Sequence, residues 1–378
     1  MTLPLTQRVV MLGQFGGSEG FTVMEQPMPS PGVGQVLVKV LAASVQFTDV
    51  ILRKGRYPDL KQRPPLVLGY DVVGEVVKVG PGATSLVVGQ RVADLTMTGS
   101  YAQYRTLDVS RVVVVDPALD PAEVTSMLLS WVIAFQLLHR VAQVQRGQRL
   151  LVLGAAGAVG QALVVLGKRA GCEVWGATRA EHAELIRALG ATHLDSDHTD
   201  FAKVLRGGFD VVLDGIGEQG FSRAWRAVCP TGRLTAYGFS AGVKANVSLA
   251  TLGLWFAKLW WWNTFSGPRK ATFVSITSLR EEHPAWFVED VGALMTMLAH
   301  GEIKPRVAER IGLEAVADAH ARLERGHLEG KIVLIPNPRA LAVVRGPDRS
   351  LSHLVAAGAP VKSRIARTSP KPNLSGPR

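Results

Sequence analysis

The spacing of hydrophobic positions changes at about residue 123 of the chain. Before it, short runs rich in Val and Leu are separated by Gly and Pro, at 35–44, 66–80, 89–95 and 111–116. Such runs predict an antiparallel, barrel-like sheet. From Pro121 the runs lengthen, and residues 121–144 predict one long, largely buried helix.

Strand and helix patterns then alternate. We expect strands at 150–153, 173–177, 193–194, 209–217, 232–238 and 272–278. A helix follows the first strand and runs to 170, another lies between the strands at 209–217 and 232–238, and further helices are expected at 181–189, 249–262 and 284–300. Alternation of this kind predicts a parallel sheet with helices on both faces. Residues 303–311, a helix at 314–325 and a strand at 330–336 fit a return to the first domain.

The turn after the strand at 150–153 has the spacing of a dinucleotide-binding motif. Residues 155–160 are AAGAVG, the G-x-G-x-x-G frame with Ala155 in its first position. Gly157 permits the backbone to approach a pyrophosphate, and Gly160 permits close packing of helix on strand. A glycine-rich turn without a ligand is the alternative. The residues expected to bind the dinucleotide are Ala156, Gly157, Ala158, Val159 and Gly160.

The end of the second strand favours NADPH over NADH. NAD-binding domains carry Asp or Glu there, for the ribose hydroxyls. Here the strand ends at Thr178-Arg179, and an Arg can pair with a 2′-phosphate through its charge and its forked donors. A solvated loop position for Arg179 is the alternative.

Four segments resemble the medium-chain dehydrogenase/reductases: GYDVVGEVVKVG (69–80), GAAGAVG (154–160), DGIG (214–217) and AHARLERGHLEGKIVLIP (319–336). The likeness covers residues 8–336 and extends to the zinc-free quinone oxidoreductases, including the vesicle amine transport protein branch, whose WWN element is similar to residues 261–263. It implies an α/β fold with two domains. A GroES-like β-barrel catalytic domain would span 1–124 and 303–338, and a Rossmann doubly wound parallel-sheet domain would span 125–302. It also implies a homodimer through the nucleotide domain.

The zinc ligands of the zinc-dependent relatives are missing. Those relatives have a Cys, a His-Glu pair and a further Cys or Asp, whereas this chain has Val45-Gln46 and Tyr70-Asp71 at the matching points. No Cys precedes Cys172, and Tyr and Gln are poor zinc ligands. We therefore expect no metal, and hydride transfer from NADPH to an electrophilic acceptor. Quinones and α,β-unsaturated carbonyls fit, as the resemblance also implies.

Hydride addition leaves negative charge on the carbonyl oxygen, so the site needs a hydrogen-bond donor. Residues 43–58 resemble the family segment whose Asn and Tyr face the nicotinamide: Tyr57 takes the tyrosine position and Gln46 replaces the Asn. Loop packing for Tyr57 and an exposed position for Gln46 are the alternatives. By the same resemblance, the residues expected against the ribose and nicotinamide are Gly215, Ile216, Gly217, Gly238, Phe239 and Ser240.

The net charge of +11 is concentrated at the end of the chain. Residues 338–378 hold six Arg and two Lys against one Asp, a net of +7, and the composition of 339–378 predicts a disordered basic tail. Nucleic-acid binding is therefore not expected. Two cysteines and the lack of a secretory pattern at the N-terminus indicate a reducing, cytoplasmic location.

A different class of function stays open. Residues 252–265 contain four Trp, which suit helix packing, a lid over an apolar substrate or contact with a membrane surface. Ile133 stands where many relatives have a Thr that contacts the nicotinamide. The rival hypothesis is an NADPH-binding adaptor with little activity, docked on a membrane or partner through the Trp-rich segment and the tail.

Overall fold

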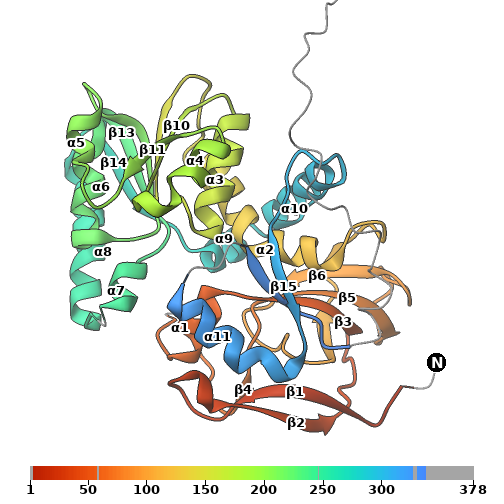
Figure 1. Ribbon diagram of the computed structural model, residues 1–378. Coiled ribbons are helices and arrows are strands. Elements are labelled where there is room, and N and C mark those ends of the chain that lie inside the picture. The colour runs from red at the N-terminus through yellow and green to blue at the C-terminus, as the bar shows by residue number, and fades with distance from the viewer. Residues whose placement is uncertain (1–2, 58, 246, 327–329, 338–378) are drawn as a thin grey trace, which may run out of the picture.

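The computed structural model describes residues 3–57, 59–245, 247–326 and 330–337. They form two sheet-based domains with helix α2 (Pro121–Phe135) between them (Figure 1). The predicted basic tail at 339–378 lies outside the described residues.

The first domain contains two sheets. The larger has the order β15-β16-β3-β5-β6-β8, with β7 also paired to β3, and the smaller has the order β2-β1-β4. Strands of the larger sheet are β3 (Gln35–Val45), β5 (Asp71–Val79), β6 (Arg91–Leu95), β7 (Tyr104–Asp108), β8 (Val113–Val114), β15 (Val307–Ile311) and β16 (Lys331–Leu334). Those of the smaller are β1 (Thr6–Leu12), β2 (Phe21–Pro27) and β4 (Leu66–Val67).

Strand β3 shows why this sequence forms a barrel-like sheet. Val36, Val38 and Val40 alternate along it and are fully buried in one cluster with Val72 and Val92 of the neighbouring strands. Strand β16 pairs antiparallel with β3, so the end of the described chain returns to the first sheet. The domain limits at 124/125 and 302/303 stay predictions.

The second domain is a six-stranded parallel sheet with the order β11-β10-β9-β12-β13-β14. Its strands are β9 (Arg149–Leu153), β10 (Glu173–Thr178), β11 (Thr192–Asp195), β12 (Phe209–Asp214), β13 (Val228–Ala236) and β14 (Lys270–Phe273). Its helices are α3 (Ala158–Arg169), α4 (Ala183–Ala188), α5 (Phe201–Val204), α6 (Ser222–Ala227), α7 (Ser240–Lys244) and α8 (Leu249–Phe265). Helix α10 (Pro284–Ala299) packs on α2. The order reverses between β9 and β12, as in a doubly wound sheet.

The continuous apolar run of β9 follows from burial on both faces of that sheet. Leu150 and Val152 belong to one core cluster, whereas Leu151 and Leu153 belong to the other. The predicted α/β class, with a barrel-like domain and a doubly wound domain, is confirmed.

Helix α2 is shorter than the predicted 121–144 segment. Asp120 caps it by accepting a hydrogen bond from the Ala122 N–H (2.9 Å), and a wider π-helical turn follows at Gln136–Val141. The stretch Pro121–Val141 is long and apolar enough to cross a membrane, but 83% of its apolar window is buried in the protein. That burial is typical of a core helix.

The strand predicted at 272–278 is confirmed only at its start, and its second half is wrong. Strand β14 ends at Phe273, and helix α9 (Ile276–Glu282) begins three residues later. The Ile and Thr residues there favour a strand by propensity. Tertiary contacts override it, because α9 leaves the sheet for the first domain, where Arg280 forms an ion pair with Asp94 and donates to the Leu95 carbonyl at 2.5 Å.

One buried histidine makes stability depend on pH. His320, on helix α11 (Val316–Arg325), is fully buried beside Tyr101 and Phe21. Burial, aided by Arg53, lowers its pKa to about 3. The pKa of His320 is lower in the folded protein than in the unfolded chain. Its contribution to the free energy of unfolding is therefore complete above pH 6.5 and is lost as the pH falls.

We expect the free energy of unfolding to drop by about 2 kcal/mol between pH 8 and pH 5 through this group. Urea unfolding of the wild type, His320→Gln and the exposed-site control His300→Gln at both pH values checks this. Between pH 8 and pH 5, the free energy of unfolding should fall less in His320→Gln than in the other two proteins. An equal fall in all three would contradict the role of His320.

Candidate active site

The glycine turn after β9 is built for close backbone approach. A β-carbon on Gly160 would lie 2.3 Å from the Gly154 carbonyl oxygen, so only glycine permits this contact between turn and helix. Gly154 itself has φ +73°. Gly157 is the N-cap of α3 and has no side chain to cap the helix. The first N–H groups of α3 are thus available to an anion, as a pyrophosphate requires.

A second loop meets this turn at the point where the strand order reverses. Asp214, at the end of β12, accepts hydrogen bonds through Oδ1 from the N–H groups of Ile216 (2.7 Å) and Gly217 (3.0 Å). Burial raises the pKa of Asp214 to about 6, against the effect of those two hydrogen bonds. A β-carbon on Gly154 would lie 2.7 Å from the Ile216 side chain, so the two loops are in contact.

A third loop, after β13, lies on the second. The Ala241 N–H donates to the Ile216 carbonyl (3.0 Å), and a β-carbon on Gly238 would lie 2.8 Å from the Gly215 oxygen. The three glycine segments that the sequence singles out, 156–160, 215–217 and 238–240, therefore gather at one edge of the sheet. This cradle fits a dinucleotide, and contacts of its individual residues with a cofactor stay predictions.

Arg179 begins the turn after β10, but it has a partner that the sequence reasoning missed. Its guanidinium, on a side chain 57% exposed, pairs with Glu181 at 2.8 Å. Glu181 also contacts His182 at 3.3 Å. Thr178 is buried, and its carbonyl accepts the Ser196 N–H at 3.0 Å. A 2′-phosphate would therefore compete with Glu181 for Arg179.

Removing this competitor should tighten NADPH binding. We expect Glu181→Gln to lower the dissociation constant of NADPH by about two- to fivefold, the range of an exposed ion pair. Arg179→Ala should raise that constant on the order of tenfold. Because NADH lacks the 2′-phosphate, it serves as the control in fluorescence titrations. Equal effects on both nucleotides would contradict a role of Arg179 at the phosphate.

Gln46 lies in the first domain, inside a buried polar network. Its side chain donates through Nε2 to Asp71 Oδ2 (2.5 Å) and accepts through Oε1 from Lys331 Nζ (2.7 Å). Gln46 is 5% exposed, so the exposed position considered for it is wrong. Its catalytic role stays a prediction. Because both ends of its amide are bonded to Asp71 and Lys331, the contacts favour a structural role in this network.

Asp71 is the centre of this network, at the point where zinc relatives have the Glu of their His-Glu pair. It also accepts from the Ser44 N–H (2.7 Å), the Ser44 hydroxyl (2.5 Å) and the Thr125 hydroxyl (2.9 Å). Burial raises the pKa of Asp71 and lowers that of Lys331 to about 8, and each charge opposes the other's shift. Across the described ranges, no three His, Cys, Asp or Glu side chains are grouped to hold a metal.

Three hydroxyl groups meet between the domains. Tyr57 Oη lies 3.0 Å from Tyr70 Oη and 3.1 Å from Thr277 Oγ1, and Tyr70 Oη lies 3.1 Å from the same threonine. Tyr57 follows helix α1 (Phe47–Arg53), Tyr70 precedes β5, and Thr277 belongs to α9. Burial raises the pKa of both phenols. Thr277 is not among the residues predicted for the site, because the residue pattern around it favours a strand.

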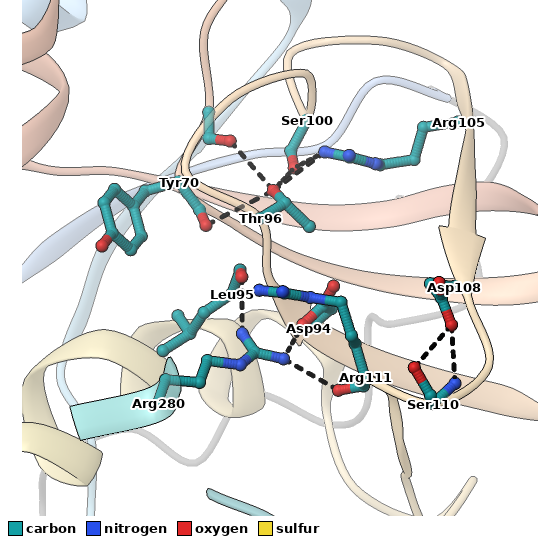
Figure 2. A network of polar contacts seen from close by, with 11 residues as sticks. Tyr70, Asp94, Leu95, Thr96, Ser100, Arg105, Asp108, Ser110, Arg111 and Arg280 are labelled. Atoms are coloured by element: carbon teal, nitrogen blue, oxygen red, sulfur yellow. Dashed lines mark hydrogen bonds and ion pairs between the residues drawn. The ribbon is translucent and has the colours of Figure 1, made fainter. Parts of the chain in front are cut away.

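A cavity of about 340 Å³ opens beside these hydroxyls. Residues of both domains line it, among them Leu60, Tyr70, Leu95, Ile276, Thr277 and Arg280. Figure 2 shows one wall, where Arg280 reaches Asp94 and the carbonyls of Leu95 and Arg111. Because β14 is parallel to β13 in register, α9 starts at the same sheet edge as the glycine loops. The wall of the cavity that α9 forms therefore starts from that sheet edge.

Comparison with known proteins agrees with this architecture. Residues 32–117 match the alcohol dehydrogenase GroES-like domain, and residues 189–334 match the zinc-binding dehydrogenase family. The chain is 28% identical to the synaptic vesicle membrane protein VAT-1 homolog of Rattus norvegicus, over 88% of this chain and 84% of that protein. It is 30% identical to a 2-haloacrylate reductase of Burkholderia sp, over 85% and 96% respectively.

Solved structures of quinone oxidoreductases have the same fold as this chain. A quinone oxidoreductase of Pseudomonas syringae superposes with a TM-score of 0.77 at 27% identity, and mycobacterial Rv1454c in complex with NADPH with 0.74 at 29%. Each match covers 87% of this chain and 100% of the other. The chain therefore belongs to the zinc-free, quinone oxidoreductase-like medium-chain dehydrogenase/reductases, a family of nicotinamide-dependent oxidoreductases.

Proposed function

We propose that this protein uses NADPH to reduce a quinone or an α,β-unsaturated carbonyl compound without a metal. The observation that carries the proposal is the cavity between the domains, which Tyr70 and Thr277 line with hydroxyls 3.1 Å apart. Thr277 belongs to α9, the helix that follows β14 at the sheet edge that bears the glycine loops. The names of the similar quinone oxidoreductases and of the 2-haloacrylate reductase support this class of acceptor.

The glycine loops are the residues that would hold the dinucleotide. The N–H groups at the start of α3 would bind the pyrophosphate, and Arg179 would bind the 2′-phosphate. The loops 215–217 and 238–240 would lie against the ribose and nicotinamide. When bound, the nucleotide supplies the hydride.

The first domain supplies the environment of the acceptor. Leu60, Leu95 and Ile276 give part of the cavity apolar walls, and polar and charged side chains, among them Lys61, Arg111 and Glu281, line the rest. The hydroxyls at its end donate hydrogen bonds to the carbonyl oxygen, where negative charge grows as hydride arrives. A proton from solvent completes the reduction.

The proposal is tested by nucleotide titration followed by NADPH oxidation with a panel of quinones and enones, with and without EDTA. We expect tighter binding of NADPH than of NADH, and turnover that survives the chelator. Turnover that is lost with EDTA would contradict the metal-free reaction, and the absence of any nucleotide binding would contradict the proposal as a whole.

A second candidate, the membrane- or partner-bound adaptor, is favoured by one observation. The outer face of α8 exposes Leu254 (69%), Trp260 (63%), Trp261 (57%) and Phe265 (58%). Its inner face is packed, with Trp262 stacked on Trp225 at 4.9 Å. An exposed apolar stripe of this kind suits a membrane surface or a partner protein. The proposed homodimer would cover it equally well, since the adjacent β14 is an edge strand.

Sedimentation with vesicles of phosphatidylserine and phosphatidylcholine separates these occupants. The full chain is compared with a Trp260→Ser, Trp261→Ser variant and with a chain ending at Pro336. Co-sedimentation that the variant loses supports the adaptor. A dimer that dissociates in the variant, without vesicle binding by the wild type, supports the homodimer.

A further inference from the structure

Tyr70 stands at a position of special chemistry in this fold. It occupies the point where zinc relatives carry the histidine of their His-Glu ligand pair, and its hydroxyl is one of the three that meet between the domains. Tyr70 and Thr277 line the cavity, whereas Tyr57 is not part of its lining. The tyrosine that lines this cavity is therefore not the one that the family resemblance selects.

We propose that Tyr70, assisted by Thr277, donates the hydrogen bond to the carbonyl oxygen of the acceptor, and that Tyr57 is a positioning residue. This inference rests on the proposed reductase function. In it, the Tyr70 hydroxyl polarises the substrate carbonyl, as the zinc ion does in the zinc-dependent relatives. Tyr70 would touch the substrate, and Tyr57 would act through Tyr70.

The three hydroxyl groups can form a closed ring of hydrogen bonds. Tyr57, Tyr70 and Thr277 each carry one donor proton and lie 3.0–3.1 Å apart, so each can donate one hydrogen bond and accept one in a closed ring. A carbonyl oxygen in the cavity opens the ring by accepting from Tyr70 or Thr277. Tyr57 then continues to donate to Tyr70, which strengthens Tyr70 as a donor.

Both cavity-facing hydroxyls are held in place from behind. The Tyr70 carbonyl accepts the N–H groups of Thr96 (2.7 Å) and Met97 (3.1 Å), and Figure 2 shows its ring pointing away from the Thr96–Ser100–Arg105 contacts. Thr277 lies one helical turn before Arg280, whose guanidinium is anchored to Asp94. Donors fixed in this way need little reorganisation during reaction.

Reduction of an enone acceptor consumes one hydride and one proton. Hydride adds to the β-carbon, the C=C electron pair shifts, and the carbonyl π pair moves to oxygen as an enolate. Tyr70 and Thr277 stabilise that oxygen by hydrogen bonds, and one proton from solvent gives the saturated ketone while NADPH becomes NADP⁺. Because burial raises the pKa of the Tyr70 phenol well above its ordinary value, the group keeps its donor proton at neutral pH.

The test compares Tyr70→Phe with Tyr57→Phe and Thr277→Val, using 2-cyclohexen-1-one as acceptor. We expect Tyr70→Phe to lower kcat/KM by about 10- to 100-fold, the effect of losing a hydrogen bond to developing charge. Most of the loss should lie in kcat, and NADPH affinity should change less than twofold. Tyr57→Phe and Thr277→Val should lower kcat/KM less.

A second readout does not depend on turnover. Raman difference spectra of the enone bound in the NADP⁺ complex report polarisation of its carbonyl, and the downshift of that stretch should be lost in Tyr70→Phe and kept in Tyr57→Phe. The reverse pattern, or no downshift in the wild type, overturns the assignment. If the wild type shows the downshift but does not oxidise NADPH with any of the quinones and enones tested, the proposed reductase function fails instead.

Discussion

Replacing Gly157 with Asp is expected to abolish nicotinamide dinucleotide binding and leave the fold intact. The backbone of Gly157 has φ −70° and ψ 163°, which any L-residue adopts, and an added β-carbon would meet only the Gly154 oxygen at 3.3 Å. The new carboxylate would lie at the N-terminus of α3, where the pyrophosphate is expected. Two like charges about 4 Å apart repel each other by several kcal/mol at an intermediate dielectric constant. The affinity for NADPH should therefore fall at least 100-fold.

Gly157→Asn is the matched control, because it has the same size without the charge. It should weaken NADPH binding much less than Gly157→Asp, while both variants keep the circular dichroism and urea midpoint of the wild type. Equal losses in the two variants would show that space, rather than charge, limits this turn. Unchanged affinity in Gly157→Asp would contradict the assignment of the turn to a dinucleotide.

Replacing Lys331 with Met is expected to have the largest effect on stability. Lys331 is 9% exposed and donates to Gln46, which in turn donates to the fully buried Asp71. Without the lysine, Asp71 keeps a buried charge with no cation in the network. Removing one partner of a buried charge pair costs about 3–5 kcal/mol, and the loss should appear in the free energy of unfolding by urea.

Two further variants separate this effect from a general loss of lysine. Lys304→Met, at an exposed position, should stay within about 0.5 kcal/mol of the wild type. The double variant Lys331→Met, Asp71→Asn should recover part of the loss, because it removes the uncompensated charge. If Lys331→Met matches the wild type, Asp71 does not depend on this lysine.

Features carried by local pattern were predictable from the sequence. The buried strand, glycine turn and helix from Leu150 to Arg169 follow from a short contiguous motif. The parallel sheet around them follows from the alternation of strand and helix patterns. The absence of zinc-ligand residue types at Gln46 and Tyr70 was also visible.

Features carried by distant contacts were not predictable. Gln46 and Lys331 are 285 positions apart, and Tyr70 and Thr277 are 207 apart, so no local pattern links them. The helix at Thr277 forms against the strand propensity of its own residues, and its Arg280 is anchored to Asp94 of the other domain. The Arg179–Glu181 pair is local, but it depends on the short 3₁₀ turn at Ala180–His182.

Hydride transfer itself is tested most directly with NADPH that carries deuterium in both C4 positions of the nicotinamide and 2-cyclohexen-1-one as acceptor. We predict that one deuterium appears at the β-carbon of the cyclohexanone product, seen by mass spectrometry and NMR, and that Gly157→Asp forms no labelled product. Oxidation of labelled NADPH with no deuterium in the product would contradict direct hydride transfer to the acceptor.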